Sequence, residues 1–153
     1  NIIFNYNSIM SKLIICRGIP ASGKSTWAKQ WVLEDPEHRV RINQDDIRNM
    51  LGKYWVPSRE PLVQHIQEEA IIEALERGYD IVIDNTNLNE KVLHNYRALV
   101  LAHGNHAIEL KDFFDTPLSV CIKRDKARDL QVTEKVIRGF YNNYKDMYPL
   151  NGN

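Results

Sequence analysis

Hydrophobic and polar positions divide this chain into two kinds of segment that alternate along its length. Short apolar or alternating runs, typical of buried strands, occupy residues 12–17, 39–43, 79–83 and 107–114. Apolar residues recur at helical spacing in residues 24–33, 45–52, 61–77, 89–103, 117–128 and 133–144. Strands that alternate with helices predict an α/β fold with a parallel sheet, whose ligands bind at the carboxyl ends of the strands.

Composition adds that the chain forms one compact domain. It has 153 residues, of which 43% are hydrophobic and 26% charged, and its 20 basic residues balance its 20 acidic ones. No apolar run reaches the roughly 18 residues of a membrane helix, so we expect no membrane partner. Zero net charge argues against a protein that coats nucleic acid, but it leaves room for a local basic groove. Two cysteines, Cys16 and Cys121, predict buried thiols and a reducing, cytoplasmic location.

We expect the domain to span residues 11–149. Residues 1–10 are interpreted as a disordered or artificial extension, because Met10 resembles a natural start, and residues 150–153 as a tail. Pro117 and Thr133 are predicted to begin the last two helices, with Thr133 as a cap. We expect a monomer or a small homo-oligomer.

A phosphate-binding loop is the most specific motif. Residues 18–25 match G-x-x-x-x-G-K-[ST] and lie between a predicted strand and a predicted helix, as the motif requires. Lys24 is predicted to reach the β and γ phosphate oxygens, and the Ser25 hydroxyl to bind Mg²⁺. The expected nucleotide-binding residues are Gly18, Ala21, Ser22, Gly23, Lys24, Ser25 and Thr26.

Acidic and basic residues follow the second strand. Asp45 and Arg48 share a helix face at a spacing of i, i+3. The carboxylate can accept the proton of an attacking hydroxyl, and the arginine can hold an anionic part of that substrate. Alternatively, Asp45 or Asp46 caps the helix and Arg48 only pairs with it.

A polar cluster ends the third strand. Asp84 stands where phosphate-loop enzymes often place a carboxylate that holds a metal-bound water. The next residues, Asn85, Thr86 and Asn87, are candidates to bind a substrate phosphate or ribose. Alternatively, asparagine and threonine here cap the next helix, and Asn89 is the best candidate for that role.

Two arginines, Arg124 and Arg128, are spaced i, i+4 in the helical segment after the fourth strand. Two stacked cations cost a few tenths of a kcal/mol unless an anion lies opposite them. The segment can therefore act as a lid whose arginines neutralise a transferring phosphoryl group. Alternatively, it is a solvated face on which the arginines pair with Asp125 and Asp129.

Together these motifs resemble the 5′-hydroxyl polynucleotide kinase family, particularly the kinase domain of its phage type. The resemblance covers residues 12–148 and rests on the segments 18–27, 42–48, 86–89 and the Arg124/Arg128 helix. It implies a P-loop kinase fold, a three-layer sandwich with four or five parallel strands and a helical lid. It also implies ATP and Mg²⁺ as cofactors and a 5′-hydroxyl end of DNA or RNA as acceptor, in nucleic-acid end healing and repair.

The resemblance assigns roles to individual residues. Asp45 would be the general base on the 5′-hydroxyl, Arg48 would contact the adjacent phosphate, and Thr86 and Asn87 would touch the acceptor. Lys24 and Arg128 would complete the catalytic set, with Arg124 and Arg128 on the ATP phosphates and Asp84 holding metal through water.

The sequence departs from the phage-type pattern in two places, and two other functions stay open. Gln44 stands where a basic residue is expected, and Asn85 where an acidic one is expected. No D-x-D-x-T motif occurs, so we expect no 3′-phosphatase activity. The alternatives are a kinase of a nucleoside or other small hydroxyl compound, and a non-catalytic ATP-binding regulatory module.

Overall fold

A computed structural model describes residues 10–149 of the chain. Its strands are β1 (Lys12–Arg17), β2 (Arg39–Ile42), β3 (Asp80–Asp84) and β4 (Ala107–Asp112). They form one parallel sheet in the order β2-β3-β1-β4, which confirms the α/β prediction with four strands in the described residues. The predicted extension and tail fall almost wholly in residues 1–9 and 150–153, outside the described part.

Each predicted helix is present with shifted ends. The helices are α1 (Lys24–Glu34), α2 (Gln44–Met50), α3 (Glu60–Glu76), α4 (Glu90–Ala102), α5 (Leu118–Lys126) and α6 (Glu134–Tyr144). Two short 3-10 turns, η1 (Pro57–Arg59) and η2 (Lys145–Met147), precede α3 and follow α6. The main difference is that α5 ends at Lys126, so Arg128 lies in the loop between α5 and α6 and not on the predicted lid helix.

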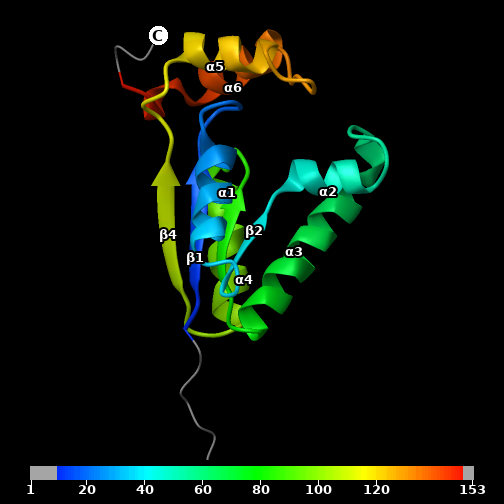
Figure 1. Cartoon of the computed structure of the whole chain (residues 1–153), viewed down its shortest axis with the longest axis vertical. Helices are drawn as coiled ribbons and strands as arrows, with labels where there is room; N and C mark the ends of the chain where they lie inside the picture. The colour runs from blue at the N-terminus through cyan, green and yellow to red at the C-terminus, as the bar shows by residue number, and fades with distance from the viewer. Residues whose placement is uncertain (1–9, 150–153) are drawn as a thin grey trace, which may run out of the picture.

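Both faces of the central strands are apolar, which explains the three layers. Leu13 and Ile15 of β1 pack with α3 and α4, whereas Ile14 and Cys16 of the same strand pack with α1. Successive side chains of a strand point to opposite faces, so an unbroken apolar run serves two helical layers. Figure 1 shows α1 on one face of the sheet and α4 on the other. The predicted three-layer sandwich is confirmed.

Helices α5 and α6, which we call the lid, lie across the carboxyl ends of the strands (Figure 1). A third apolar cluster joins the lid to the loops beneath it. Its buried members are Ile19, Leu88, Leu118, Cys121, Ile122, Ile137 and Tyr148. Because Ile19 and Leu88 belong to the loops after β1 and β3, this cluster fixes the lid beside the ends of both central strands.

Cys16 and Cys121 are both buried and unbonded to one another, as the sequence predicts. Burial raises the pKa of the Cys16 thiol to about 12. Within residues 10–149, no helix combines the length and the apolar character that crossing a bilayer requires.

Candidate active site

The phosphate loop connects β1 to α1 and depends on glycine at two positions. A Cβ atom on Gly18 would lie 2.7 Å from Ser22 Oγ and 3.1 Å from Phe113 Cβ, closer than packed atoms tolerate. Gly23 has φ 104° where α1 begins, a conformation that suits glycine. Ala21 also has positive φ, at 63°. The loop is therefore held in a strained, predefined shape.

Lys24 is buried inside this loop. Its Nζ donates hydrogen bonds to the carbonyl oxygens of Gly18 and Ile19, both at 2.8 Å, and to Ser22 Oγ at 3.2 Å. Burial lowers the pKa of Lys24 to about 8, although the nearby charge of Asp84 opposes this shift. An anion that entered the loop would favour the charged ammonium.

The lid and the segments beside it contact the loop at three points. The Ile19 N–H donates to Tyr148 Oη at 2.9 Å, and Thr116 Oγ1 donates to the Ser22 carbonyl at 2.9 Å. Arg124 Nη1 donates to the Ala21 carbonyl at 3.4 Å. The structure thus brings Arg124 to the phosphate loop, where the lid interpretation expects it.

Arg128 differs from that expectation. Its guanidinium donates to Asp125, which confirms the predicted alternative of a pair with that aspartate. Because α5 ends first, the predicted stacking of Arg124 and Arg128 on one helix face is wrong. The charge of Arg128 nevertheless adds slightly to the lowering of the Lys24 pKa, so the two cations lie within electrostatic range of each other.

Asp125 organises the turn between the two lid helices. It is 1% exposed, and its carboxylate accepts from the backbone N–H groups of Val132 and Thr133, both at 3.0 Å. Burial by itself would raise the pKa of Asp125, but these bonds and the one from Arg128 lower it. Thr133 is the N-cap residue of α6, as predicted, but its side chain makes no cap hydrogen bond.

Asp84 lies at the end of β3 and is 1% exposed. Its Oδ2 accepts from Arg41 Nε and Nη2, both at 2.8 Å. Its Oδ1 is buried and has no hydrogen-bond partner among the described residues. Such an unsatisfied oxygen calls for a water or an ion, and it fits a water bound to Mg²⁺. Ser25 lies exposed in the first turn of α1, and its hydroxyl makes no hydrogen bond within residues 10–149 that would keep it from a ligand.

Mg²⁺ at this position would need the nucleotide. The described residues contain no cluster of three acidic, histidine or cysteine side chains that could hold a metal by themselves. Mg²⁺ is commonly held by one or two protein groups together with substrate phosphates. The Ser25 and Asp84 pair is consistent with that pattern.

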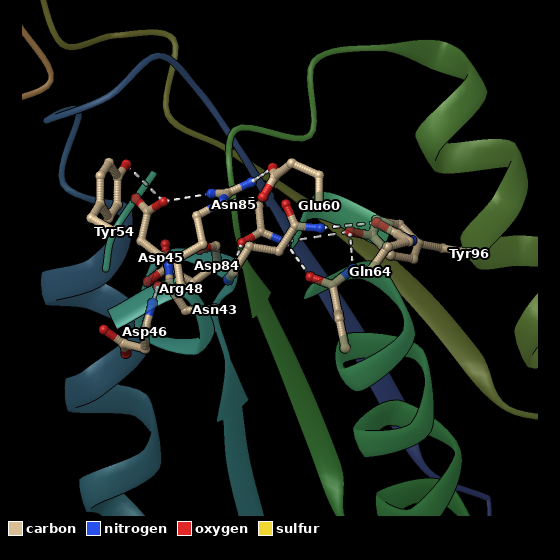
Figure 2. Close-up of polar contacts among 12 residues, drawn as sticks. Asn43, Asp45, Asp46, Arg48, Tyr54, Glu60, Gln64, Asp84, Asn85 and Tyr96 are labelled. Atoms are coloured by element: carbon tan, nitrogen blue, oxygen red, sulfur yellow. Dashed lines mark hydrogen bonds and ion pairs between the residues drawn. The ribbon is translucent and has the colours of Figure 1, made fainter. Parts of the chain in front are cut away.

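Asp45 lies in the first turn of α2 with its side chain 48% exposed. Its Oδ1 accepts from Arg48 Nη1 at 2.7 Å and from the Tyr54 hydroxyl at 3.0 Å (Figure 2). The alternative that Asp45 or Asp46 caps this helix is wrong, because Asn43 Oδ1 accepts from the Asp46 N–H at 2.8 Å. Asp45 Oδ2 makes no hydrogen bond within residues 10–149, so one oxygen of the fixed carboxylate is open.

Arg48 is held by a second carboxylate that the sequence analysis missed. Its Nε and Nη2 donate to the two carboxylate oxygens of Glu60, and its side chain is 17% exposed. Glu60 begins α3 and Tyr54 lies in the loop before it, so no local spacing relates either residue to Asp45 (Figure 2). Burial and the charge of Asp45 raise the pKa of Tyr54 to about 12, which keeps its hydroxyl protonated as a donor.

The amides after β3 are used inside the fold. Asn85 accepts from the Gln44 N–H at 2.9 Å and donates to Gln67 Oε1 at 2.7 Å. Asn87 is 5% exposed; it donates to the Cys16 carbonyl at 2.8 Å and accepts from the Tyr96 hydroxyl at 3.0 Å. The structure therefore gives the Asn87 side chain a structural role in place of the predicted acceptor contact.

Thr86 and Asn89, the other two polar residues of this segment, make different contacts. The Thr86 carbonyl accepts from the Gly18 N–H at 3.1 Å, which ties this segment to the phosphate loop. Asn89 Oδ1 accepts from the Lys91 N–H at 2.8 Å and caps α4, as its alternative interpretation proposed. Thr86 and Asn87 were both expected to touch the acceptor. Of the two, Thr86 has a side chain that makes no hydrogen bond within the described part of the chain.

A groove of about 680 Å³ opens beside this segment. It is lined by residues 85–89 together with side chains from α2, α3, α4 and α6. Most of its polar lining is uncharged; the sequence pointed to residues 85–87 of this lining, but not to the side chains from the four helices. Its size lies within the range of about 300–1,000 Å³ that is usual for ligand sites.

A family model described as AAA domain matches residues 13–147. The chain belongs to this family. The match covers β1 to η2, so it includes the phosphate loop, the Asp45 segment and the lid.

Two curated relatives are similar to this chain in sequence. An L-seryl-tRNA(Sec) kinase from Methanococcus maripaludis is 24% identical over 135 residues, which are 86% of this chain and 52% of the relative. A protein of Autographa californica nuclear polyhedrosis virus, named as a bifunctional polynucleotide kinase/RNA ligase, is 26% identical over 132 residues, 76% of this chain and 18% of the relative. The chain thus spans about half of the first relative's length and less than a fifth of the second's.

Two solved structures share the fold. A chain in the structure of the Pnkp1/Rnl/Hen1 RNA repair complex has a TM-score of 0.74 and 23% identity, covering 95% of this chain and 48% of that one. The Mycobacterium tuberculosis APS kinase CysC in complex with AMPPNP and APS has a TM-score of 0.60 and 17% identity, covering 90% and 75%. These comparisons confirm the resemblance to polynucleotide kinases, and the fold is that of a P-loop kinase.

Proposed function

We propose that this chain is an ATP-dependent kinase that transfers the γ-phosphate to a 5′-hydroxyl end of DNA or RNA. The observation that carries the proposal is the fixed, half-exposed carboxylate of Asp45 at the sheet edge that also holds the phosphate loop. Arg48 and Tyr54 orient one oxygen of that carboxylate and leave the other open. The viral relative named as a polynucleotide kinase/RNA ligase and the chain of the RNA repair complex support a role in nucleic-acid end healing.

In this proposal Asp45 Oδ2 takes the proton of the acceptor hydroxyl as its oxygen attacks the γ-phosphorus. The bond between the γ-phosphorus and the β–γ bridging oxygen breaks, and ADP leaves. Lys24, with Arg124 of α5 and Arg128 of the loop between α5 and α6, stabilises the charge on the phosphoryl oxygens. Arg48 holds the acceptor phosphate next to the hydroxyl. When bound, Mg²⁺ neutralises charge on the β and γ oxygens, and Ser25 and Asp84 would hold it.

A kinase of a small hydroxyl compound is the second candidate. It is favoured by the groove beside Thr86, whose lining within residues 10–149 contains one charged side chain, Glu68, and no cation. A long phosphate backbone in that groove would meet no positive charge. The APS kinase and the L-seryl-tRNA(Sec) kinase are named for quite different acceptors, although they share this fold or sequence pattern.

The deciding experiment is the transfer of γ-labelled phosphate from Mg²⁺-ATP to 5′-hydroxyl DNA and RNA oligonucleotides. We expect labelled oligonucleotide from the wild type and a rate lower by about 10²–10⁴-fold from Asp45→Asn, the usual size of a general-base effect. Glu37→Gln is the control, because Glu37 is exposed between α1 and β2, away from the carboxyl ends of the strands, and its side chain makes no hydrogen bond within residues 10–149. It should stay near the wild-type rate.

Two results would contradict the proposal. Asp45→Asn within tenfold of the wild type would remove Asp45 as the base. The absence of label on every oligonucleotide, while ATP still binds, would favour the small-molecule acceptor.

A further inference from the structure

The groove beside Thr86 has an unusual polar lining. Side-chain amides from three elements and the segment after β3 face it, and Glu68 is its one charged side chain. The amides belong to Gln44, Gln64, Asn85, Asn87, Asn89 and Asn95. Phe140 and Tyr144 of α6 contribute aromatic rings at the lid side. None of the motifs in the sequence explains why uncharged amides gather here.

These amides divide into those that build the groove and those left to contact a ligand. Asn85 and Asn87 are used inside the fold, as described above. Gln44 Nε2 donates to Gln64 Oε1 at 3.0 Å, and Gln64 Nε2 donates to Glu68 Oε1 at 3.1 Å, so these side chains form an ordered chain along one wall. Asn95, exposed on α4, makes no side-chain hydrogen bond within residues 10–149.

This lining selects a ligand by its chemistry. An amide offers a donor and an acceptor side by side, which matches the edge of a nucleobase. Aromatic rings provide a surface on which a base stacks. A phosphate group would meet Glu68 and no cation, so the groove suits the uncharged part of a nucleotide and disfavours its phosphate.

The groove also lies where the acceptor would be. Gln44 lines it and directly precedes Asp45, the proposed base. Thr86 lines it too, and its carbonyl bonds to Gly18 of the phosphate loop. Figure 2 shows Gln64 and Asn85 on one side of this region and Asp45 with Arg48 on the other. A nucleoside held here would therefore lie beside the segments that carry the catalytic pair and the phosphate loop.

We propose that this groove binds the base of the acceptor's terminal nucleoside. The inference rests on the proposed function and deepens it, because it separates two tasks on the acceptor side. The Asp45 and Arg48 cluster handles the hydroxyl and the adjacent phosphate. The amides and aromatic rings hold the terminal base, so recognition of the strand is confined to its end.

The test compares oligonucleotides with a normal or an abasic 5′-terminal nucleoside, each carrying a 5′-hydroxyl. For the wild type we expect the abasic end to raise the acceptor KM by about 5- to 100-fold, the size of losing one stacked base. Asn95→Leu and Tyr144→Leu should shrink this ratio toward one and leave the KM for ATP unchanged. Tyr144→Phe should keep it, because the ring remains. Asn142→Leu, exposed on α6 and outside the groove, is the matched control.

Melting temperatures of the variants separate a local effect from misfolding, since Tyr144 also packs against the lid cluster. Equal KM values for normal and abasic ends in an active wild-type enzyme would overturn the groove assignment and leave the kinase proposal standing. If no oligonucleotide is phosphorylated, the proposed function fails, and equilibrium binding of free nucleosides decides the groove. Nucleoside binding that Asn95→Leu weakens would keep the groove as a base site, and no binding would remove it.

Discussion

The phosphate-loop half of the site and the acceptor half are built in different ways. In the first half, residues 18–25 alone form the phosphate loop. Lys24 donates hydrogen bonds to carbonyl and hydroxyl oxygens within six residues of itself. In the second half, Asp45 depends on Tyr54, and Arg48 depends on Glu60. Asn85 is held by Gln67, which is 18 residues away.

This difference determines what each half tolerates. A local loop keeps its shape through its backbone angles. The shape of this loop therefore depends mainly on its two glycines and on Lys24. A network across several elements fails when one distant member is removed, because the remaining polar groups stay buried without partners. We therefore expect changes in the first half to alter ATP binding and changes in the second to alter the acceptor KM.

Apart from the loss of the proposed base, the largest effect is expected for Lys24→Ala. Removing the ammonium removes a charged donor from the phosphoryl group, which costs about 10²–10³-fold in turnover, or about 2.7–4 kcal/mol. The ATP affinity should fall and the acceptor KM should stay constant, as measured by steady-state kinetics with either substrate varied. Lys29→Ala, an exposed lysine on the same helix, is the control. A rise in the acceptor KM alone would mean that the two halves are not separable.

The lid gives the second prediction. Asp125→Ala should lower the free energy of unfolding by about 1–3 kcal/mol, because two partly buried donors lose a charged acceptor. Those donors are the N–H groups of Val132 and Thr133. Urea titration measures the change, and Asp129→Ala, exposed in the same loop, should be neutral. Equal stability of the two variants would mean that the lid turn does not depend on Asp125.

Sequence patterns predicted the fold and the phosphate loop well, since both depend on local information. The apolar run of β1 predicts a strand, and the glycines at 18 and 23 predict the loop. Each pattern is contained within a few neighbouring residues. Asp45 and Arg48 were likewise found from their i, i+3 spacing, and the structure pairs them at 2.7 Å.

The rest of the site depends on contacts that no spacing encodes. Glu60 and Tyr54 reach Asp45 and Arg48 only once α2 and α3 have packed together. Asn87 was expected to face the acceptor, but its φ of 48° and its bond to Cys16 turn its amide inward. Arg128 was expected on the helix of residues 117–128, but α5 ends at Lys126. Asp125 accepts from the Val132 N–H, and this bond favours a turn in place of a further helical residue. Each difference comes from a polar side chain satisfied by a distant partner.

The acceptor half gives the third prediction. Gln67 is fully buried and joins Asn85 to Tyr96, at 2.7 and 3.3 Å. Gln67→Leu should destabilise the chain by about 1–3 kcal/mol, because the Asn85 amide loses its acceptor. It should raise the acceptor KM and leave the ATP affinity unchanged. Gln30→Leu, on the exposed face of α1, is the control; a weakened ATP affinity in Gln67→Leu would contradict the division into two halves.

The smallest effect concerns pH and the phosphate loop. The pKa of Lys24 is lowered from 10.5 to about 8 by burial, so the folded chain releases this proton at a lower pH than the unfolded chain does. Without ligand, this group makes stability rise with pH above about 8, because the unfolded chain then binds more protons. Cys16, whose pKa burial raises from 9.0 to about 12, acts in the opposite direction above pH 9. Between about pH 8 and 9 the rise from Lys24 therefore precedes the opposing effect of Cys16.

ATP should reverse the shift of Lys24, because the phosphates favour the charged ammonium and raise its pKa. The ATP affinity should then fall as pH rises through about 8, by at most tenfold per pH unit, and binding at pH 8.5 should take up a proton. Calorimetry in two buffers of different ionisation enthalpy measures that proton. Lys24→Arg stays charged and should take up none, whereas Lys29→Ala should match the wild type. Proton uptake that persists in Lys24→Arg would assign the titration to another group. It would then contradict the inference that burial in the loop lowers the pKa of Lys24 to about 8.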